Sequence, residues 1–298
     1  MERKAHIDLF GAVALVLFAL NLGFNQVVIK VSSGGFNPVF AAGLRSVGAI
    51  AVLLAWMGLR RVSFHVPRHV WLPGLGAGVL FSLEFLCLFT ALDITTVSRA
   101  SVIFYSMPVW LALSGHVLLP GERLTGARMT GLAIAMAGVA LALSDRSGGH
   151  VSWAGDLLAL AAALCWASLA LLVRATPLRQ VGPAPQLLFQ VAVSAPVLLL
   201  LAPLFGPLVR DLEPIHLVGL VYQTVAVASL GFLFWFWLLT IYPTSSVASF
   251  SFLSPVFAVI LGWLLLSERV AWSIWVALGL VAAGIYLINR NPAAGGNA

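Results

Sequence analysis

The sequence predicts an all-α integral membrane protein with ten transmembrane helices, arranged as two inverted five-helix repeats. Three observations lead to this prediction: the composition, the number of long apolar stretches, and an internal repeat. Of the 298 residues, 61% are hydrophobic and only 9% are charged, whereas soluble domains contain about 25% charged residues. So few charges cannot cover the surface of a water-soluble globule. The composition therefore excludes a soluble enzyme, a nucleic-acid-binding protein and a disordered scaffold.

Ten apolar stretches are long enough to cross a bilayer, for which a helix needs about 20 residues. The first stretch follows Arg3 and Lys4, as the core of a signal peptide would. It continues to Val31 without a small-residue cleavage site, so we expect a retained helix. The connections are short and leave no room for a soluble domain. The ten predicted spans are residues 8–31, 38–59, 70–92, 96–119, 126–144, 152–174, 185–206, 214–239, 243–267 and 271–289.

The basic residues predict the orientation of these spans. With the N-terminus inside, ten Lys and Arg residues fall in cytoplasmic segments and five on the opposite side, while Arg45 lies within the second span. Cytoplasmic connections carry the excess of Lys and Arg in membrane proteins. We therefore expect both termini in the cytoplasm, and we attribute the net charge of +6 to this bias rather than to a nucleic-acid partner.

The chain contains an internal repeat at an offset of about 147 residues, which divides it into residues 1–147 and 148–298. Matches of Pro, Gly and an adjacent Glu-Arg carry the repeat, because matches of Leu or Ala arise easily in apolar sequence. Since each repeat has five spans, the second enters the membrane from the opposite side, as in many secondary transporters. The principal matches are Ser98 with Ser245, Pro108 with Pro255, Gly115 with Gly262, and Glu122-Arg123 with Glu268-Arg269.

Two tandem five-helix units of this kind resemble the EamA-type branch of the drug/metabolite transporter superfamily. The residues that carry the resemblance are 108–138 and 255–284, and it covers essentially the whole chain. Within the superfamily, residues 84–87, residues 105–108 and Trp166 are similar to the bacterial aromatic amino-acid exporters. The resemblance implies a multi-pass exporter in a bacterial inner membrane.

Two ionisable residues lie deep within predicted spans, where a charge costs at least about 2.5–3.5 kcal/mol on insertion scales. Arg45 and Glu84 lie at matching depth on consecutive antiparallel helices. One interpretation is a buried ion pair that joins the two helices. The other is that Glu84 faces a cavity and binds a substrate ammonium or carries a coupling proton. Their counterparts in the second repeat are Gln190 and Gly231, so the repeated fold does not itself require the pair.

Polar and aromatic residues within the spans predict a central substrate cavity, lined by the first, third, fourth, sixth, eighth and ninth helices. Buried amides are costly, and a deep Trp can stack against an aromatic or aliphatic substrate. Plain helix packing is the alternative for each of these side chains. The predicted cavity residues are Asn21, Asn25, Glu84, Tyr105, Trp166, Tyr222, Gln223 and Trp237.

Proline and small residues predict features of the helices themselves. Pro108 and Pro255 each weaken a helix at matching positions, which favours either gating kinks or fixed bends. Small residues suit close packing of helices, and we expect a structural role for them. These residues are Gly131, Ala135 and Gly138 in the fifth span and Gly279, Ala283 and Gly284 in the tenth.

We expect a secondary transporter that exports small amphipathic metabolites by alternating access, with aromatic or large neutral amino acids as the favoured substrates. A drug or nucleoside exporter of the same superfamily is the alternative, and the energy source stays open. An intramembrane hydrolase is a distant third, based on Ser114-Gly115-His116. Residues two apart on a helix point in different directions, and the sequence contains no HExxH motif. We therefore expect no catalytic residue, and we expect no metal or cofactor. The expected partners are a small-molecule substrate and the lipid bilayer. A monomer is compatible with the fused repeat, and the sequence leaves the oligomeric state open.

Overall fold

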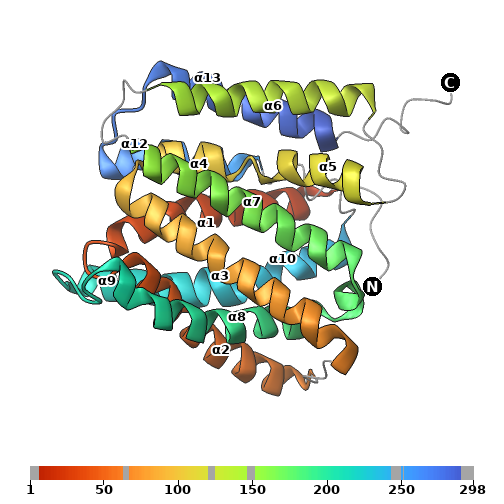
Figure 1. The fold of residues 1–298 in the computed structure, drawn as a ribbon, viewed down its shortest axis with the longest axis vertical. Helices are drawn as coiled ribbons and strands as arrows, with labels where there is room; N and C mark the ends of the chain where they lie inside the picture. Colours follow the sequence, from red (N-terminus) through yellow and green to blue (C-terminus); the bar gives the residue numbers. More distant parts are fainter. Residues whose placement is uncertain are drawn as a thin grey trace.

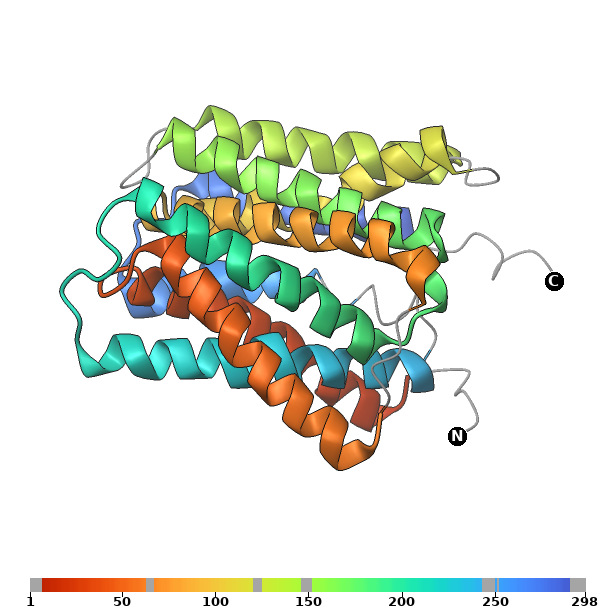
Figure 2. The same ribbon diagram turned by 60° about the horizontal axis from the view of Figure 1, so that its bottom comes forward.

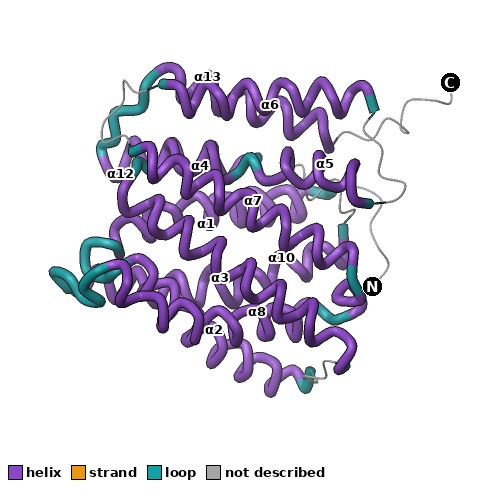
Figure 3. Tube along the Cα trace, in the orientation of Figure 1, coloured by secondary structure: helices purple, strands orange, loops and turns teal. Residues whose placement is uncertain are grey.

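The computed structural model describes residues 7–62, 67–119, 125–145, 152–242, 250 and 252–289, and in these ranges the chain is helical with no β-strand. Figure 3 shows helices joined by short connections. The elements of the first half are α1 (Leu9–Ser32), α2 (Pro38–Arg60), η1 (Arg68–Val70), α3 (Trp71–Ile94), α4 (Val97–Phe104), α5 (Met107–Leu118) and α6 (Gly126–Ser144). Those of the second half are α7 (Trp153–Ala175), η2 (Pro177–Gln180), α8 (Pro183–Leu201), η3 (Ala202–Phe205), α9 (Pro214–Tyr222), η4 (Gln223–Ser229), α10 (Leu230–Ile241), α12 (Leu253–Leu266) and α13 (Trp272–Asn289).

The all-α membrane architecture is confirmed. Eight helical segments in the described part of the chain are long and apolar enough to cross a bilayer, and α12 and α13 are shorter apolar helices. The eight correspond to the first eight predicted spans. The ninth predicted span begins at residue 243, and residues 243–249 and 251 lie outside the described residues.

The fourth span is two helices rather than one. Helix α4 ends at Phe104 and α5 begins at Met107, and Figure 3 shows the short connection between them. Pro108 is the second residue of α5 and has no N–H to donate to a carbonyl one turn earlier, so a continuous helix is disfavoured here. Pro255 is the third residue of α12. Both prolines therefore lie in the first turn of a helix, and their gating role stays a prediction.

The helices pair across the two halves of the chain. Helices α6 and α13 lie side by side at one edge of the bundle, and α2 packs on α8 near the opposite edge (Figure 1). Between these edges α3 packs on α7, and α1 packs on α12. Figure 2 shows α2 crossing obliquely over the segment of α9, η4 and α10. The space between the halves is thus enclosed by helices from both.

The small residues of α6 and α13 allow these two helices to approach closely. A Cβ atom on Gly284 would lie 2.5 Å from both the Cβ of Ala135 and the carbonyl oxygen of Gly131, and one on Gly138 would lie 2.8 Å from the carbonyl oxygen of Ala277. The expectation of a packing role is therefore confirmed for Gly131, Ala135, Gly138 and Gly284.

The same expectation is wrong for two residues of α13. A Cβ atom on Gly279 would meet nothing within 4 Å among the described residues, and Ala283 is exposed. Neither residue lies on the side of α13 that meets α6.

A pair of substitutions on α13 tests this packing. Gly284→Ala places a methyl group where the backbone of α6 already lies, so we expect a lower thermal unfolding midpoint for the purified protein. Gly279→Ala is the matched control, because its methyl group enters open space. Alanine is favoured over glycine in a helix by about 1 kcal/mol, so the control should unfold at the wild-type temperature or above it. Equal midpoints for the two variants would contradict the close contact.

Candidate functional site

A cavity of about 360 Å³ lies between the two halves of the bundle. Its walls come from α1, α2, α3, α4, α7, α8, η4 and α10. The predicted set of helices thus gains the second and seventh spans, while no described residue of the ninth predicted span lines this cavity. The apolar side chains include Leu22, Phe81, Phe85, Leu88, Phe104, Trp166, Phe232, Trp235 and Phe236, and the polar ones are Asn25, Gln26, Arg45, Glu84, Tyr105, Arg174, Gln186 and Gln190.

The two deep charges both line this cavity. Arg45 is 1% exposed and Glu84 is 4% exposed. No salt bridge joins them in the part of the chain that the structure describes, and Arg45 Nε and Glu84 Oε2 are buried without a hydrogen-bond partner there. The Arg45 guanidinium instead lies over the rings of Phe85 and Phe89, 3.8 and 4.9 Å from their centroids. A cation over an aromatic face is attracted by the ring, and this contact positions the guanidinium.

Two amides of α1 also present unused acceptors. Asn25 Oδ1 and Gln26 Oε1 are buried and have no hydrogen-bond partner among the described residues. Gln26 Nε2 donates to the hydroxyl of Tyr105 at 3.5 Å. An unsatisfied buried polar atom costs about 1–3 kcal/mol. The walls of one cavity thus carry several polar atoms whose hydrogen-bonding capacity the described residues do not use.

Aromatic rings form the wall next to these polar groups. Trp166 stacks on Phe104 with 5.0 Å between ring centroids and an interplanar angle of 18°. Tyr105 meets the edge of the same indole at 6.2 Å. The break between α4 and α5 places Tyr105 just beyond the end of α4. The structure brings Asn25, Glu84, Tyr105 and Trp166 together on the walls of one cavity, and their role in binding substrate stays a prediction.

Three other predicted cavity residues instead join α1 to α9 and η4. The Tyr222 hydroxyl donates to Asn21 Oδ1 at 2.5 Å, and Asn21 Nδ2 donates to the carbonyl oxygen of Ala226 at 3.0 Å. Gln223 Nε2 donates to Ser32 Oγ at 3.0 Å. Residues 223–229 form a π-helix, whose wider turns are uncommon and depend on their surroundings. These polar side chains stabilise that segment against α1.

The placement of Trp237 in the cavity is wrong. Its side chain is 38% exposed on the outer surface of the bundle, where it stacks on Phe234 and meets the edge of Phe10. Trp235 and Phe236 line the cavity instead. Residues two apart on a helix point in different directions, so Trp235 and Trp237 cannot share one face.

Sequence reasoning also missed several cavity residues. Gln26 directly follows Asn25, and a second amide at mid-helix was a usable signal. Gln190 was identified only as the counterpart of Arg45, yet both line the cavity. Phe104 gave no signal, because a Phe in an apolar helix is normally packed against lipid or other helices.

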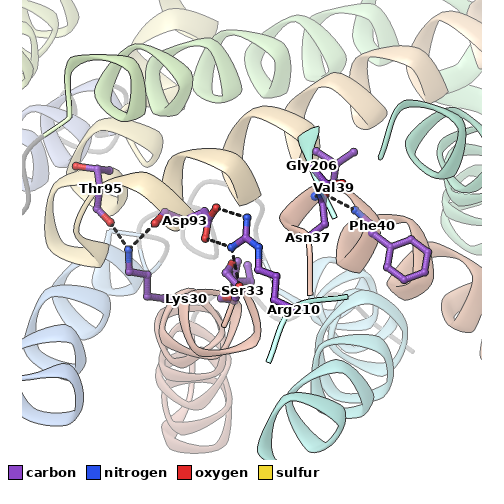
Figure 4. Close-up of polar contacts among 10 residues, drawn as sticks. Lys30, Ser33, Asn37, Val39, Phe40, Asp93, Thr95, Gly206 and Arg210 are labelled. Atoms are coloured by element: carbon purple, nitrogen blue, oxygen red, sulfur yellow. Dashed lines mark hydrogen bonds and ion pairs between the residues drawn. The ribbon is translucent and has the colours of Figure 1, made fainter. Parts of the chain in front are cut away.

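One end of the bundle, where α1 and α3 finish, is closed by a polar network (Figure 4). Lys30 Nζ donates to the carbonyl oxygens of Asp93 and Thr95 at 3.0 and 2.9 Å. The Arg210 guanidinium forms two bonds with the Asp93 carboxylate, at 2.8 and 3.0 Å, and a third with the carbonyl oxygen of Ser33 at 2.8 Å. Hydrogen bonding to Asp93 raises the pKa of Arg210 above its usual value, although partial burial opposes this.

Further contacts cross between the halves at the same end. Glu268, in the connection after α12, accepts hydrogen bonds from the backbone N–H groups of Val97 and Ser98 at 2.6 and 3.0 Å and from the Ser98 hydroxyl at 2.6 Å. A carboxylate is favoured at a helix N-terminus, here that of α4. Arg99 also forms a buried ion pair with Asp156 of α7 at 2.8 Å. We call this end, with the network of Figure 4, the closed end.

The cavity extends toward the opposite end of the bundle. Val173 and Arg174 line it near the finish of α7, and Gln186 lines it near the start of α8. We call this the open end.

A multi-helix membrane bundle with a polar and aromatic cavity between its halves, closed at one end and extending toward the other, has the architecture of a membrane transporter. The chain belongs to the EamA-like transporter family, whose sequence profile matches residues 9–144 and again residues 153–290. It is therefore a transporter rather than an enzyme.

Curated relatives agree with this family, and a solved structure shares the fold. The chain is similar to a "Probable amino-acid metabolite efflux pump" of Escherichia coli strain K12, with 28% identity over 93% of both chains. It is 30% identical to "Aromatic amino acid exporter YddG" of Ancylobacter novellus over 52% of this chain and 56% of that protein. A solved crystal structure has the same fold, with a TM-score of 0.67 at 22% identity over 93% of this chain and 96% of the other.

The residues that suggested a hydrolase do not form a catalytic site in the structure. The Ser114 hydroxyl donates to the carbonyl oxygen of Trp110 at 2.8 Å, and His116 is exposed on another side of α5. This hydroxyl–carbonyl bond is the usual arrangement of Ser within a helix.

Two conservative substitutions distinguish the paired from the unpaired buried charges. Asp156→Asn leaves Arg99 buried without its counter-ion, so we expect a loss of about 3–5 kcal/mol in the free energy of unfolding. Glu84→Gln breaks no ion pair in the described structure, so its thermal midpoint should stay close to that of the wild type. Unfolding of both variants is followed by thermal denaturation in detergent. A Glu84→Gln protein as unstable as Asp156→Asn would show that Glu84 has a structural role instead.

Proposed function

We propose that this protein exports amino acids with aromatic or other large neutral side chains across a bacterial inner membrane by alternating access. The observation that carries the proposal is that Arg45 and Glu84, two buried opposite charges, face one cavity without forming a salt bridge to each other in the described structure. The two charges attract each other without direct contact, and a buried charge that lacks a direct partner is unfavourable. An amino acid is a zwitterion and supplies a counter-ion to each.

The polar groups suit the two ends of such a zwitterion. Arginine binds carboxylates through two parallel hydrogen bonds, so Arg45 is assigned to the substrate carboxylate. An ammonium has three donors and no acceptor. Glu84, together with the unused oxygens Asn25 Oδ1 and Gln26 Oε1, offers the acceptors that an ammonium requires.

The remaining walls suit an apolar side chain. Trp166, Phe104 and Tyr105 pack together beside the polar groups, and Phe232, Trp235 and Phe236 come from the other side. Aromatic rings pack favourably against one another in offset or edge-to-face arrangements. Similarity to a probable amino-acid metabolite efflux pump of Escherichia coli and to an aromatic amino-acid exporter of Ancylobacter novellus supports the same substrate class and the direction of transport.

The two family matches and the pairing of helices across the halves support an inverted repeat, which is the usual basis of alternating access. With both termini in the cytoplasm, as the basic residues predict, the open end faces the cytoplasm. Substrate then loads from the cytoplasm in this state. Release requires the closed end to open, which breaks the contacts of Lys30, Arg210 and Glu268.

The zwitterion assignment predicts which analogues compete with phenylalanine. Proteoliposomes that exchange radiolabelled L-phenylalanine are challenged with phenethylamine, which lacks the carboxylate, and 3-phenylpropionate, which lacks the ammonium. Each lost charged hydrogen-bonding group costs about 1.5–3 kcal/mol, so both analogues should compete about ten- to a hundredfold less well than phenylalanine.

Variants identify which group binds which end. In Glu84→Gln, phenylalanine should bind no better than 3-phenylpropionate, and in Arg45→Gln no better than phenethylamine. Trp237→Phe, on the outer surface, is the control and should behave as wild type. Exchange with and without a pH gradient tests proton coupling. Folded protein that exchanges no amino acid would contradict the proposal and favour a drug or nucleoside substrate.

Alternating access predicts that weakening the closed end exposes the cavity there. A cysteine is placed at Leu88, in a background with Cys87 and Cys165 replaced by serine. Arg210→Gln removes the bonds to Asp93, so a membrane-impermeant maleimide added at the closed end should label this cysteine several-fold faster. Arg60→Gln, an exposed charge at the other end of α2, is the control. An unchanged labelling rate in the Arg210 variant would show that this network does not hold the end closed.

A further inference from the structure

A second, smaller chamber adjoins the main cavity. It has a volume of about 80 Å³ and lies between α1, α10 and α12. Leu22, Tyr105, Trp166, Phe232 and Trp235 line both spaces, so the chamber lies directly beside the cavity. A single water molecule needs about 10–15 Å³ of cavity volume. The chamber therefore has room for a group of several non-hydrogen atoms.

The chamber is apolar except at two hydroxyl groups. Its own walls include Leu15, Phe18 and Ala19 of α1, and Phe18 stacks on Trp235 with 4.9 Å between ring centroids. Neither Arg45 nor Glu84 lines it. Such a space excludes a charged group and favours a ring or a branched aliphatic group.

Ser254 is the polar exception at the α12 side. Its side chain is 1% exposed and lies next to the Tyr105 hydroxyl, and Ser254 Oγ forms no hydrogen bond of good geometry within the described residues. Tyr105, the other hydroxyl of the chamber, already accepts a hydrogen bond from Gln26. A buried hydroxyl with spare hydrogen-bonding capacity at the apolar end of a binding cavity favours a ligand that carries a hydrogen-bonding group at its tip.

We propose that this chamber is the side-chain subsite of the carrier and that Ser254 hydrogen-bonds a polar group at the far end of a substrate ring. The inference rests on the proposed function, because it assumes that the zwitterionic end of an amino acid occupies the main cavity beside Arg45 and Glu84. Tyrosine, with a hydroxyl at the end of its ring, is then preferred over phenylalanine. The subsite selects by length and by the polar tip, whereas the main cavity selects for the amino-acid group.

The test compares the two amino acids as competitors in exchange of radiolabelled L-phenylalanine by the full-length protein in liposomes. Ser254→Ala removes the hydroxyl with little change in volume. We expect the competition by L-tyrosine to weaken by about five- to tenfold, as the loss of one hydrogen bond implies, while that by L-phenylalanine stays the same. Ser101→Ala is the matched control, because Ser101 Oγ is buried without a partner in the described structure but lines neither space.

A second variant tests the space itself. Ala19 lines the smaller chamber and not the main cavity, so Ala19→Leu fills the chamber. Competition by tyrosine and phenylalanine should then fall while competition by L-valine persists. If the wild type exchanges amino acids but the tyrosine-to-phenylalanine ratio is the same in Ser254→Ala, the subsite is overturned and the proposed function stands. If no amino acid competes at all, the proposed function fails and this inference fails with it.

Discussion

The cost of burying charge within a bilayer is the constraint on which the rest of this structure depends. A charge far from water needs a partner, and the buried charges of this chain meet that need in two ways. At the closed end, Arg99 pairs with Asp156 and Glu268 accepts hydrogen bonds at the start of α4. At the cavity, Arg45 and Glu84 form no salt bridge to each other in the described structure. The first set stabilises one conformation, and we propose that the second binds a ligand.

Helix packing explains how both sets can exist in one bundle. Glycines let α6 and α13 pack backbone against backbone at one edge of the bundle. This close packing stabilises the bundle, while the inner helices enclose a cavity. The interruption before Pro108 and the π-helix at residues 223–229 both occur in helices next to that space. Irregular backbone in a membrane protein is tolerated where it is buried in protein or lines a cavity. Here it places Tyr105 and Val227 on the walls.

The sequence predicts the fold well because hydropathy and span length depend only on local composition. Small residues at helical spacing predict the close packing of Gly284, and the depth of Arg45 and Glu84 predicts an unusual environment, which in the structure is the wall of a cavity. Helix rotation is harder to predict. A π-helix adds a residue to each turn, so it changes the phase of everything after it, and Trp235 rather than Trp237 faces the cavity. Asn21 and Asn25 are on one face of α1, yet Asn21 meets the π-helix and Asn25 meets the cavity. The periodicity of a helix shows which residues share a face, but it does not show which other helix packs against that face.

The central claim is that Arg45 and Glu84 bind the two ends of an amino acid. An experimental structure of the protein with L-phenylalanine bound tests it most directly. The account predicts the ammonium within about 4 Å of the Glu84 carboxylate and the carboxylate within the same distance of the Arg45 guanidinium, the limit for an ion pair, with the ring pointing toward Trp166. A ligand bound in the opposite orientation, or away from both charges, would contradict the account.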